Sequence, residues 1–363
     1  MGALTLLSNL FALELPVYAL FTVVVIYVCL FGRDLLPVVP MAILCYFTPS
    51  TGNNPGRNPD SVFFPENGLY FIVTLFCLIV VALLFRIINR KDALWFFKPK
   101  RKLLLGFLAI AVAFMLGGVG TEFYSWSNFR YVLLLLLSLF FFYYLFTALI
   151  DWKNTPKDYL PFVCMVAGLT VALELVAIYF TSKELISDGQ IIRDYLFTGW
   201  GIHNNIGATL TMFMPFAFYL AAVKKHGFVY NIIGQVLYLA VILRNSRNAI
   251  LMGCFIYLAS AVLVLLQKKN RKGNAIVYAL ALAAVGVVLL LFFEKVVKMF
   301  NRILDFSIFE NGRFGIYEKG WEQFLNSPVC GNGFFSSKAV DIYDFSEQAL
   351  FIPPRWHNTA IHI

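Results

Sequence analysis

The sequence has 363 residues, of which 60% are hydrophobic and only 13% are charged. This composition excludes an ordinary soluble domain and is typical of a polytopic membrane protein. The formal net charge is +9 at pH 7, but the Lys and Arg residues concentrate in alternate loops, which is the positive-inside pattern of membrane proteins. The positive charge is therefore explained without a nucleic-acid partner. The expected environment of the protein is a lipid bilayer.

Ten apolar runs predict membrane-spanning helices. A bilayer core takes about 20 mostly apolar residues per helix, and continuously apolar runs predict helices instead of a β-barrel. We expect two spans within residues 13–47, separated by a turn at residues 32–34, and then spans at residues 69–88, 103–119, 131–150, 159–180, 206–223, 229–243, 249–266 and 275–293. The predicted fold is an all-α, polytopic transmembrane helical bundle.

The charge of the loops assigns them to the two sides of the membrane. The basic loops are expected in the cytoplasm: residues 90–102, 153–157, 224–225 and 268–272. The turn at residues 245–248 and the last part of the chain then lie outside. We therefore expect a transmembrane bundle over residues 1–293 and an external, partly helical loop region over residues 294–363, with further spans beyond the end of this chain.

Two arginines lie in a very short external turn between two predicted spans. Arg244 and Arg247 flank Asn245 and Ser246. One interpretation is that both guanidinium groups extend to lipid headgroups, as cationic side chains near helix ends do. The other is an anion-binding site, because paired arginines are less expected on the outer side and guanidinium groups bind phosphate oxygens well. These residues alone leave both interpretations open.

An amphipathic helix is predicted in the external region. Its aromatic and apolar residues recur at helical spacing on one face: Phe314, Tyr317, Trp321, Phe324 and Leu325. Such a helix lies on the membrane with its aromatic face among the headgroups. Arg313 stands at its beginning, where backbone N–H groups and a guanidinium together suit a phosphate.

A histidine near the end of the chain has the setting of a general base. His357 follows Arg355 and Trp356 and precedes Asn358, the expected N-cap of a helix. A lone loop histidine is more often incidental than catalytic. A helix N-terminus, however, disfavours the imidazolium form and keeps the side chain neutral, which is the state that a base requires.

Three further polar residues stand out from their surroundings. Asn204 and Asn332 lie in glycine-rich turns, and for the first of these turns a helix cap is the simpler interpretation. Glu174 lies near the middle of the predicted span at residues 159–180. A carboxylate inside a membrane is by default functional or paired, and a transporter would use it for coupling.

Motifs for nucleotides, metals and a serine nucleophile are absent. The sequence has no P-loop, no HExxH and no Gly-x-Ser-x-Gly motif, nor the Asp-x-Asp pattern of metal-dependent nucleotide-sugar enzymes. His357 and His362 are not spaced as two ligands on one helix face, and the cysteines show no metal-binding spacing. We expect neither a metal nor a cofactor.

Four short motifs together resemble the O-antigen ligase and polysaccharide polymerase (Wzy-C type) family of bacterial membrane proteins. They are Asn245-Ser246-Arg247, Gly312-Arg313 before the aromatic helix, the element from Ser327 to Phe334, and His357-Asn358. Each motif is weak alone, but their order and shared external side are specific. The resemblance covers roughly residues 200–363, whereas the N-terminal half matches only as a row of spans.

The resemblance implies a glycosyltransferase of the inner membrane that builds cell-surface polysaccharide with an active site on the outer side. Members move glycan from an undecaprenyl-pyrophosphate carrier to a glycan, lipid or protein acceptor. Arg247 and Arg313 match the arginines that hold the pyrophosphate, and His357 matches the histidine that acts on the acceptor hydroxyl. Further residues expected to bind pyrophosphate or glycan are Arg244, Asn245, Asn204, Tyr317, Asn332, Arg355, Trp356 and Asn358.

Other interpretations remain. A transporter or flippase for a lipid-linked or anionic solute would use Glu174, although it also predicts symmetry-related halves, which the sequence does not show. A scaffold with an inert external loop leaves the clustered Arg, Gly and His residues without a role. Within the enzyme class, a polymerase, a lipopolysaccharide ligase and a protein glycosyltransferase share these motifs and are not separated by them.

Overall fold

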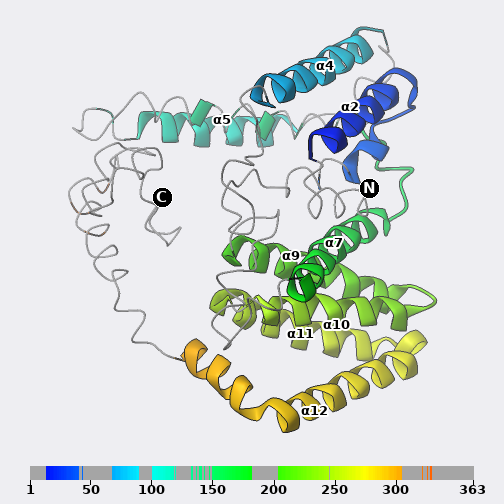
Figure 1. Cartoon of the computed structure of the whole chain (residues 1–363). Coiled ribbons are helices and arrows are strands. Elements are labelled where there is room, and N and C mark those ends of the chain that lie inside the picture. The colour runs from blue at the N-terminus through cyan, green and yellow to red at the C-terminus, as the bar shows by residue number, and fades with distance from the viewer. Residues whose placement is uncertain are drawn as a thin grey trace. The chain divides into compact units, whose positions relative to one another are not determined.

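The structure is a computed structural model that describes residues 14–40, 43, 68–89, 100–117, 119, 132–133, 136, 139–140, 143, 147, 149–181, 203–244, 246–304, 321, 325 and 328. The chain divides into two compact units. The first comprises residues 1–91 and 151–304, and the second comprises residues 92–150 and 305–363. Every regular element in the described ranges is a helix (Figure 1), which confirms the all-α prediction.

The helices agree closely with the predicted spans. The first unit contains α2 (Glu14–Phe31), η1 (Leu36–Val38), α4 (Gly68–Asn89), α7 (Tyr159–Thr181), α9 (His203–Val223), α10 (Gly227–Leu243), α11 (Arg247–Leu266), η4 (Lys268–Asn270) and α12 (Arg271–Leu304). The second unit contains α5 (Arg101–Leu116). The agreement reflects the long apolar runs, which leave a helix as the only way to satisfy the backbone in a membrane.

Among the described residues, four helices are long and apolar enough to cross a membrane. They contain the segments Tyr159–Ala177, Ile206–Val223, Asn248–Leu266 and Lys268–Leu291. Three shorter apolar helical segments, Ala19–Phe31, Cys77–Asn89 and Gly227–Leu243, fall on further predicted spans. The described residues thus establish a polytopic helical membrane protein, while the total of ten spans stays a prediction.

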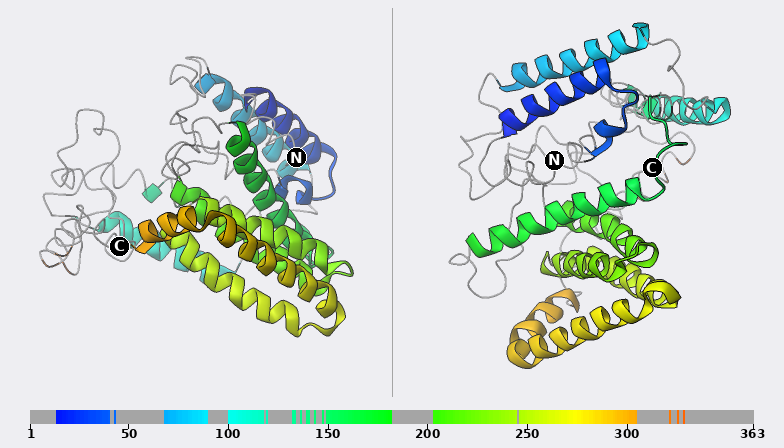
Figure 2. Two further views of the ribbon diagram at one scale, coloured as in Figure 1. Left: turned by 60° about the horizontal axis from the view of Figure 1, so that its bottom comes forward. Right: turned by 90° about the vertical axis from the view of Figure 1, so that its right-hand side faces the viewer.

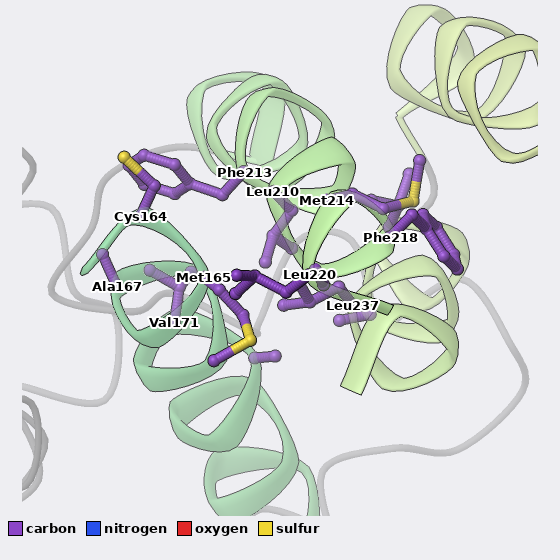
Figure 3. Packing of buried hydrophobic residues seen from close by; sticks show 14 of the residues in the cluster. Cys164, Met165, Ala167, Val171, Leu210, Phe213, Met214, Phe218, Leu220 and Leu237 are labelled. Atoms are coloured by element: carbon purple, nitrogen blue, oxygen red, sulfur yellow. The ribbon is translucent and has the colours of Figure 1, made fainter. Parts of the chain in front are cut away.

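Helices α7, α9, α10 and α11 surround the hydrophobic core of the first unit. Figure 3 shows Val171 of α7, Phe213 of α9 and Leu237 of α10 among the buried side chains of this core. A glycine permits the close approach of these helices: a Cβ added at Gly168 of α7 would lie 2.8 Å from Cβ of Phe213 and 3.4 Å from Cδ2 of Leu237. Small residues bring backbones together in the same way between many membrane helices.

The outer helices of this bundle present apolar side chains away from the core. Helices α11 and α12 pack beside each other (Figure 2) and expose large residues such as Leu251, Phe255, Leu280 and Leu290. Most of the spanning segments of α7 and α9 are buried, whereas most of those of α11 and α12 are not. An exposed apolar face of this kind suits contact with lipid.

Arg86 of α4 caps the C-terminal end of α2. Its guanidinium donates hydrogen bonds to the carbonyl oxygens of Val28 at 3.3 Å, Cys29 at 3.1 Å, Gly32 at 2.8 Å and Arg33 at 2.7 Å. The last carbonyls of a helix have no partner within the helix and carry partial negative charge. The buried Arg86 side chain therefore satisfies them and holds the ends of α2 and α4 together.

Contacts also bring the predicted cytoplasmic loops together. Asp151 lies 3.7 Å from the guanidinium of Arg33, and Lys224 forms an ion pair with Asp158. Asn270 donates hydrogen bonds from Nδ2 to the carbonyl oxygens of Lys224 at 2.6 Å and Ala221 at 3.1 Å. The loops around residues 33, 151–158, 224 and 268–272 thus lie at one end of the first unit, as the positive-inside pattern predicts for loops on one side.

Helix α12 extends beyond the predicted end of its span. The sequence predicts a span at residues 275–293 and places the external region after it, whereas α12 continues to Leu304 and bends along its length (Figure 1). In residues 294–304 the charged residues recur at helical spacing opposite apolar residues, a pattern that favours a helix at a membrane surface. The first part of the predicted external region is therefore a continuation of α12.

Replacing the capping arginine should destabilise the first unit. We expect Arg86→Met to lower the free energy of unfolding by about 3 kcal/mol, because buried carbonyl groups at the end of α2 lose a charged donor. Thermal unfolding of the detergent-solubilised protein measures the effect. The matched control is Arg33→Met: the Arg33 side chain is exposed although its partner Asp151 is buried, so its loss should lower the midpoint far less than Arg86→Met. Equal losses in the two variants would contradict the capping role.

Candidate functional site

The candidate site is built around the turn between α10 and α11. Helix α10 ends at Leu243, Arg244 is its C-cap, Ser246 is the N-cap of α11, and Arg247 is the first residue of α11. The backbone N–H of Arg244 still donates to the carbonyl oxygen of Ala240 at 3.1 Å. The very short turn predicted from the sequence is confirmed, and it places Arg247 at a helix N-terminus.

Gly207 lets the first turns of α9 and α11 touch. A Cβ added at Gly207 would lie 2.7 Å from Cβ of Ala249 and 3.2 Å from Cβ of Ser246. Thr211 of α9 donates a hydrogen bond from Oγ1 to the carbonyl oxygen of Gly207 at 2.8 Å, and the same oxygen lies 3.4 Å from the carbonyl oxygen of Ala249. The start of α11, and with it the backbone of Arg247, is therefore fixed against α9.

The contact between α9 and α11 brings the N-termini of the two helices together. Because α9 begins at His203 and α11 at Arg247, the contact at Gly207 places two helix N-termini at the same end of the bundle. Each N-terminus carries backbone N–H groups without helical partners and a partial positive charge. Two of them beside an arginine make this end of the first unit attractive to an anion.

Arg244 is buried, contrary to the headgroup interpretation. The residue is 1% exposed, whereas an arginine that extends to lipid headgroups would be open to its surroundings. Burial lowers the pKa of Arg244 to about 10, so that the guanidinium remains charged at neutral pH. A desolvated guanidinium requires compensating negative charge, so Arg244 lies in the protein interior beside the turn, while its part in substrate binding stays a prediction.

The sequence-predicted residues are covered unequally by the structure. The structure gives the backbone positions of Asn204, the second residue of α9, and of Arg247. One helical turn separates Asn204 from Gly207, so Asn204 and Arg247 stand on the two first turns that pack together. The other predicted residues lie outside the described residues: Asn245, Arg313, Tyr317, Asn332, Arg355, Trp356, His357 and Asn358. Convergence of Arg247 with Arg313 and His357 stays a prediction.

Gly207 and Thr211 were not predicted from the sequence to support the site. Both act through packing and backbone hydrogen bonds, which leave little trace in a sequence. The sequence feature that could have predicted them is a glycine in the first turns of an apolar helix, followed four residues later by a threonine. In membrane helices such small residues mark close helix contacts.

Metal binding finds no support in the described ranges. Among those residues, no group of three or more His, Cys, Asp or Glu side chains is placed to hold a metal ion. The predicted external region lies almost entirely outside these ranges, so the expectation of a site without metal or cofactor stays a prediction.

The helices and the arginine-bearing turn define a polytopic membrane protein with an anion-attracting end. In a comparison with known proteins, residues 233–363 match the family model described as O-Antigen ligase. This confirms the resemblance over that part of the chain, which includes Arg244, Arg247, Arg313 and His357. The predicted resemblance at residues 200–232 lies before the match. No curated protein and no solved structure matches the chain.

Adding a methyl group at Gly207 should separate α9 from α11. We expect Gly207→Ala to lower the free energy of unfolding by about 1–3 kcal/mol, because the new Cβ overlaps Ala249 and Ser246 in a packed interface. The measurement is thermal unfolding in detergent. Gly286→Ala is the matched control, since a Cβ there has no atom within 4 Å and alanine favours a helix over glycine. A Gly207→Ala protein as stable as the control would contradict the proposed close contact.

Proposed function

We propose that the chain is a membrane glycosyltransferase that moves glycan from an undecaprenyl-pyrophosphate carrier to an acceptor, as an O-antigen ligase or a surface-polysaccharide polymerase. The observation that carries the proposal is the family match over residues 233–363, which contains all three residues proposed for catalysis. The family and the apolar helices support a place in the bacterial inner membrane. The partners are the lipid-linked donor, a glycan or lipid acceptor, and the bilayer.

The donor side of the reaction is assigned to the arginines. Arg247 stands at the N-terminus of α11 beside the N-terminus of α9, and both ends favour negative charge. Arg313, from the external region, is the second guanidinium. As the bond between the anomeric carbon and the pyrophosphate oxygen breaks, the electron pair stays on that oxygen, and guanidinium groups in a partly desolvated site stabilise the charge without a metal.

The acceptor side is assigned to His357. Its neutral imidazole takes the proton from the acceptor hydroxyl while the hydroxyl oxygen forms the new bond to the anomeric carbon. Attack opposite the departing pyrophosphate inverts the configuration of that carbon. Pyrophosphate or glycan binding is assigned to Arg244, Asn245, Asn204, Tyr317, Asn332, Arg355, Trp356 and Asn358. Of these residues, the aromatic Tyr317 and Trp356 would stack on sugar rings.

The sidedness of the proposal follows from the loops. Basic loops gather at the end of the first unit opposite the Arg247 turn, and basic loops favour the cytoplasm. The turn and the external region then face the periplasm or cell exterior, where the lipid-linked donor of such enzymes is presented. We therefore place the active site on the outer side of the membrane.

A transporter or flippase for a lipid-linked or anionic solute is the second candidate. The observation that favours it is Glu174, a carboxylate of α7 that is only 1% exposed. An ionisable residue inside a membrane bundle marks a transport pathway in many proteins. A transporter would move the lipid-linked glycan without changing its length, whereas an enzyme changes the bonds of the glycan.

Alanine at each catalytic position should abolish glycan transfer. We expect Arg247→Ala, Arg313→Ala and His357→Ala each to lower the transfer rate by about 100-fold or more, because each removes charge stabilisation or proton transfer in the transition state. The full-length protein would be assayed in membranes with a purified lipid-linked donor. Membrane insertion, checked by reporter fusions, should be unchanged.

The control for charge is Lys268→Ala, an exposed residue of the basic end, which should retain full activity. Full activity in the triple variant at Arg247, Arg313 and His357 would contradict the proposal that the protein is a glycosyltransferase.

Lipid-linked glycans extracted from cells that lack the protein then distinguish a polymerase, a ligase and a flippase. Accumulated single-repeat carriers indicate a polymerase, long unattached polymers indicate a ligase, and donors confined to the inner leaflet indicate a flippase.

A further inference from the structure

The turns that connect α9 to α10 and α11 to α12 carry an exposed basic surface. It consists of five exposed cationic side chains: Lys225, Lys268, Lys269, Arg271 and Lys272. Residues 223–230 and 266–275, which contain the two turns, have no Asp or Glu. Their remaining cation, Lys224, forms an ion pair with Asp158. The positive charge of the basic surface is therefore not balanced within the two turns.

Asn270 ties the two turns together. Its Nδ2 donates hydrogen bonds to the carbonyl oxygens of Lys224 at 2.6 Å, Ala221 at 3.1 Å and Ala222 at 3.3 Å. Gly227 permits this approach, because an added Cβ there would lie 2.7 Å from Nδ2 of Asn270. The turns lie side by side as a result (Figure 2), and their cations form one surface instead of two separate loops.

Some of these cations stand where the helix disfavours them. Helix α12 begins at Arg271, and Lys272 follows in its first turn. A helix N-terminus carries partial positive charge, so that cations are unfavourable there, and like charges held close together repel each other. A bound anion would relieve both costs.

Exposed apolar side chains border the basic surface. Val223, Phe228, Leu266 and Ile276 are 44–69% exposed, and each lies within four residues of a cation along the chain. They stand at the ends of helices that are apolar along their length, so their surroundings are the acyl chains of the membrane. Cations next to exposed apolar side chains match the two parts of a phospholipid, whereas a soluble anion matches only the cations.

We propose that the basic surface binds the phosphate group of an anionic phospholipid in the cytoplasmic leaflet, with the acyl chains against the bordering apolar side chains. The positive-inside pattern places this end of the first unit in the cytoplasm, and anionic lipids of that leaflet attract Lys and Arg. The surface lies at the end opposite the Arg247 turn. The lipid is thus separate from the glycan donor, and its binding does not require the proposed transfer reaction.

The test compares two lipids on the purified full-length protein in detergent. Dioleoylphosphatidylglycerol and dioleoylphosphatidylcholine are added in equal amounts, and native mass spectrometry gives the ratio of the bound lipids. The wild-type protein should prefer the anionic lipid by about 10-fold or more, because each nearby cation strengthens the attraction several-fold. Equal binding of the two lipids would leave the cations with a role in topology alone and would overturn the proposal.

Two matched variants each remove two exposed lysines. Lys269→Gln/Lys272→Gln takes them from the basic surface and should lower the preference about 5-fold, while three cations remain to maintain the topology. Lys153→Gln/Lys157→Gln takes them from residues 151–158, where Asp151 and Asp158 balance their charge, and should keep the preference within about 2-fold. Equal losses in the two variants would contradict a lipid site at the basic surface.

The geometry of the surface is tested by Asn270→Ala, which keeps every charge but removes the hydrogen bonds that join the turns. The preference should fall about 3-fold, because the cations are no longer held as one surface. An unchanged preference would mean that diffuse attraction suffices, against the proposed site. Excess inorganic phosphate should leave the lipid bound, since it has no acyl chains. Complete displacement by phosphate would assign the surface to a soluble anion and reject the phospholipid.

Discussion

Polar groups buried in the bundle must find their partners within the protein, because the bilayer core offers none. Arg86 satisfies the end of α2 in this way. Asn270 and Asn274 do the same for α9: Asn274 donates from Nδ2 to the carbonyl oxygen of Ala221 at 3.3 Å and accepts at Oδ1 from Asn231 at 3.2 Å. These side chains tie one end of the first unit together.

The same constraint shapes the opposite end of the unit. There Arg244 is buried, and Gly207 brings the N-terminus of α11 against α9. One end of the unit is thus closed by asparagine and arginine caps, while the other presents helix N-termini and positive charge. A stable platform with an anion-attracting end would suit the proposed transfer from a pyrophosphate carrier.

Packing by small residues connects the fold to the site. Gly168 sets the separation of α7 from α9 and α10, and Gly207 sets that of α9 from α11. Since α9 takes part in both contacts, the position of the Arg247 turn depends on the core shown in Figure 3. The family match over residues 233–363 covers the turn but neither α7 nor α9, so these supporting helices belong to the part of the chain outside that match.

Much of this architecture was predictable from the sequence. Long apolar runs, charged loops and the short turn at Arg247 are local properties of composition and spacing, and they predict the helices, the sidedness and the family resemblance. The end of α12 was less predictable, since the amphipathic residues 294–304 extend the helix without continuing the span. Only the tertiary structure decided that Arg244 and Glu174 are buried and that Gly207 joins α9 to α11. Burial and helix contacts depend on residues far apart in the chain, and no local pattern records them.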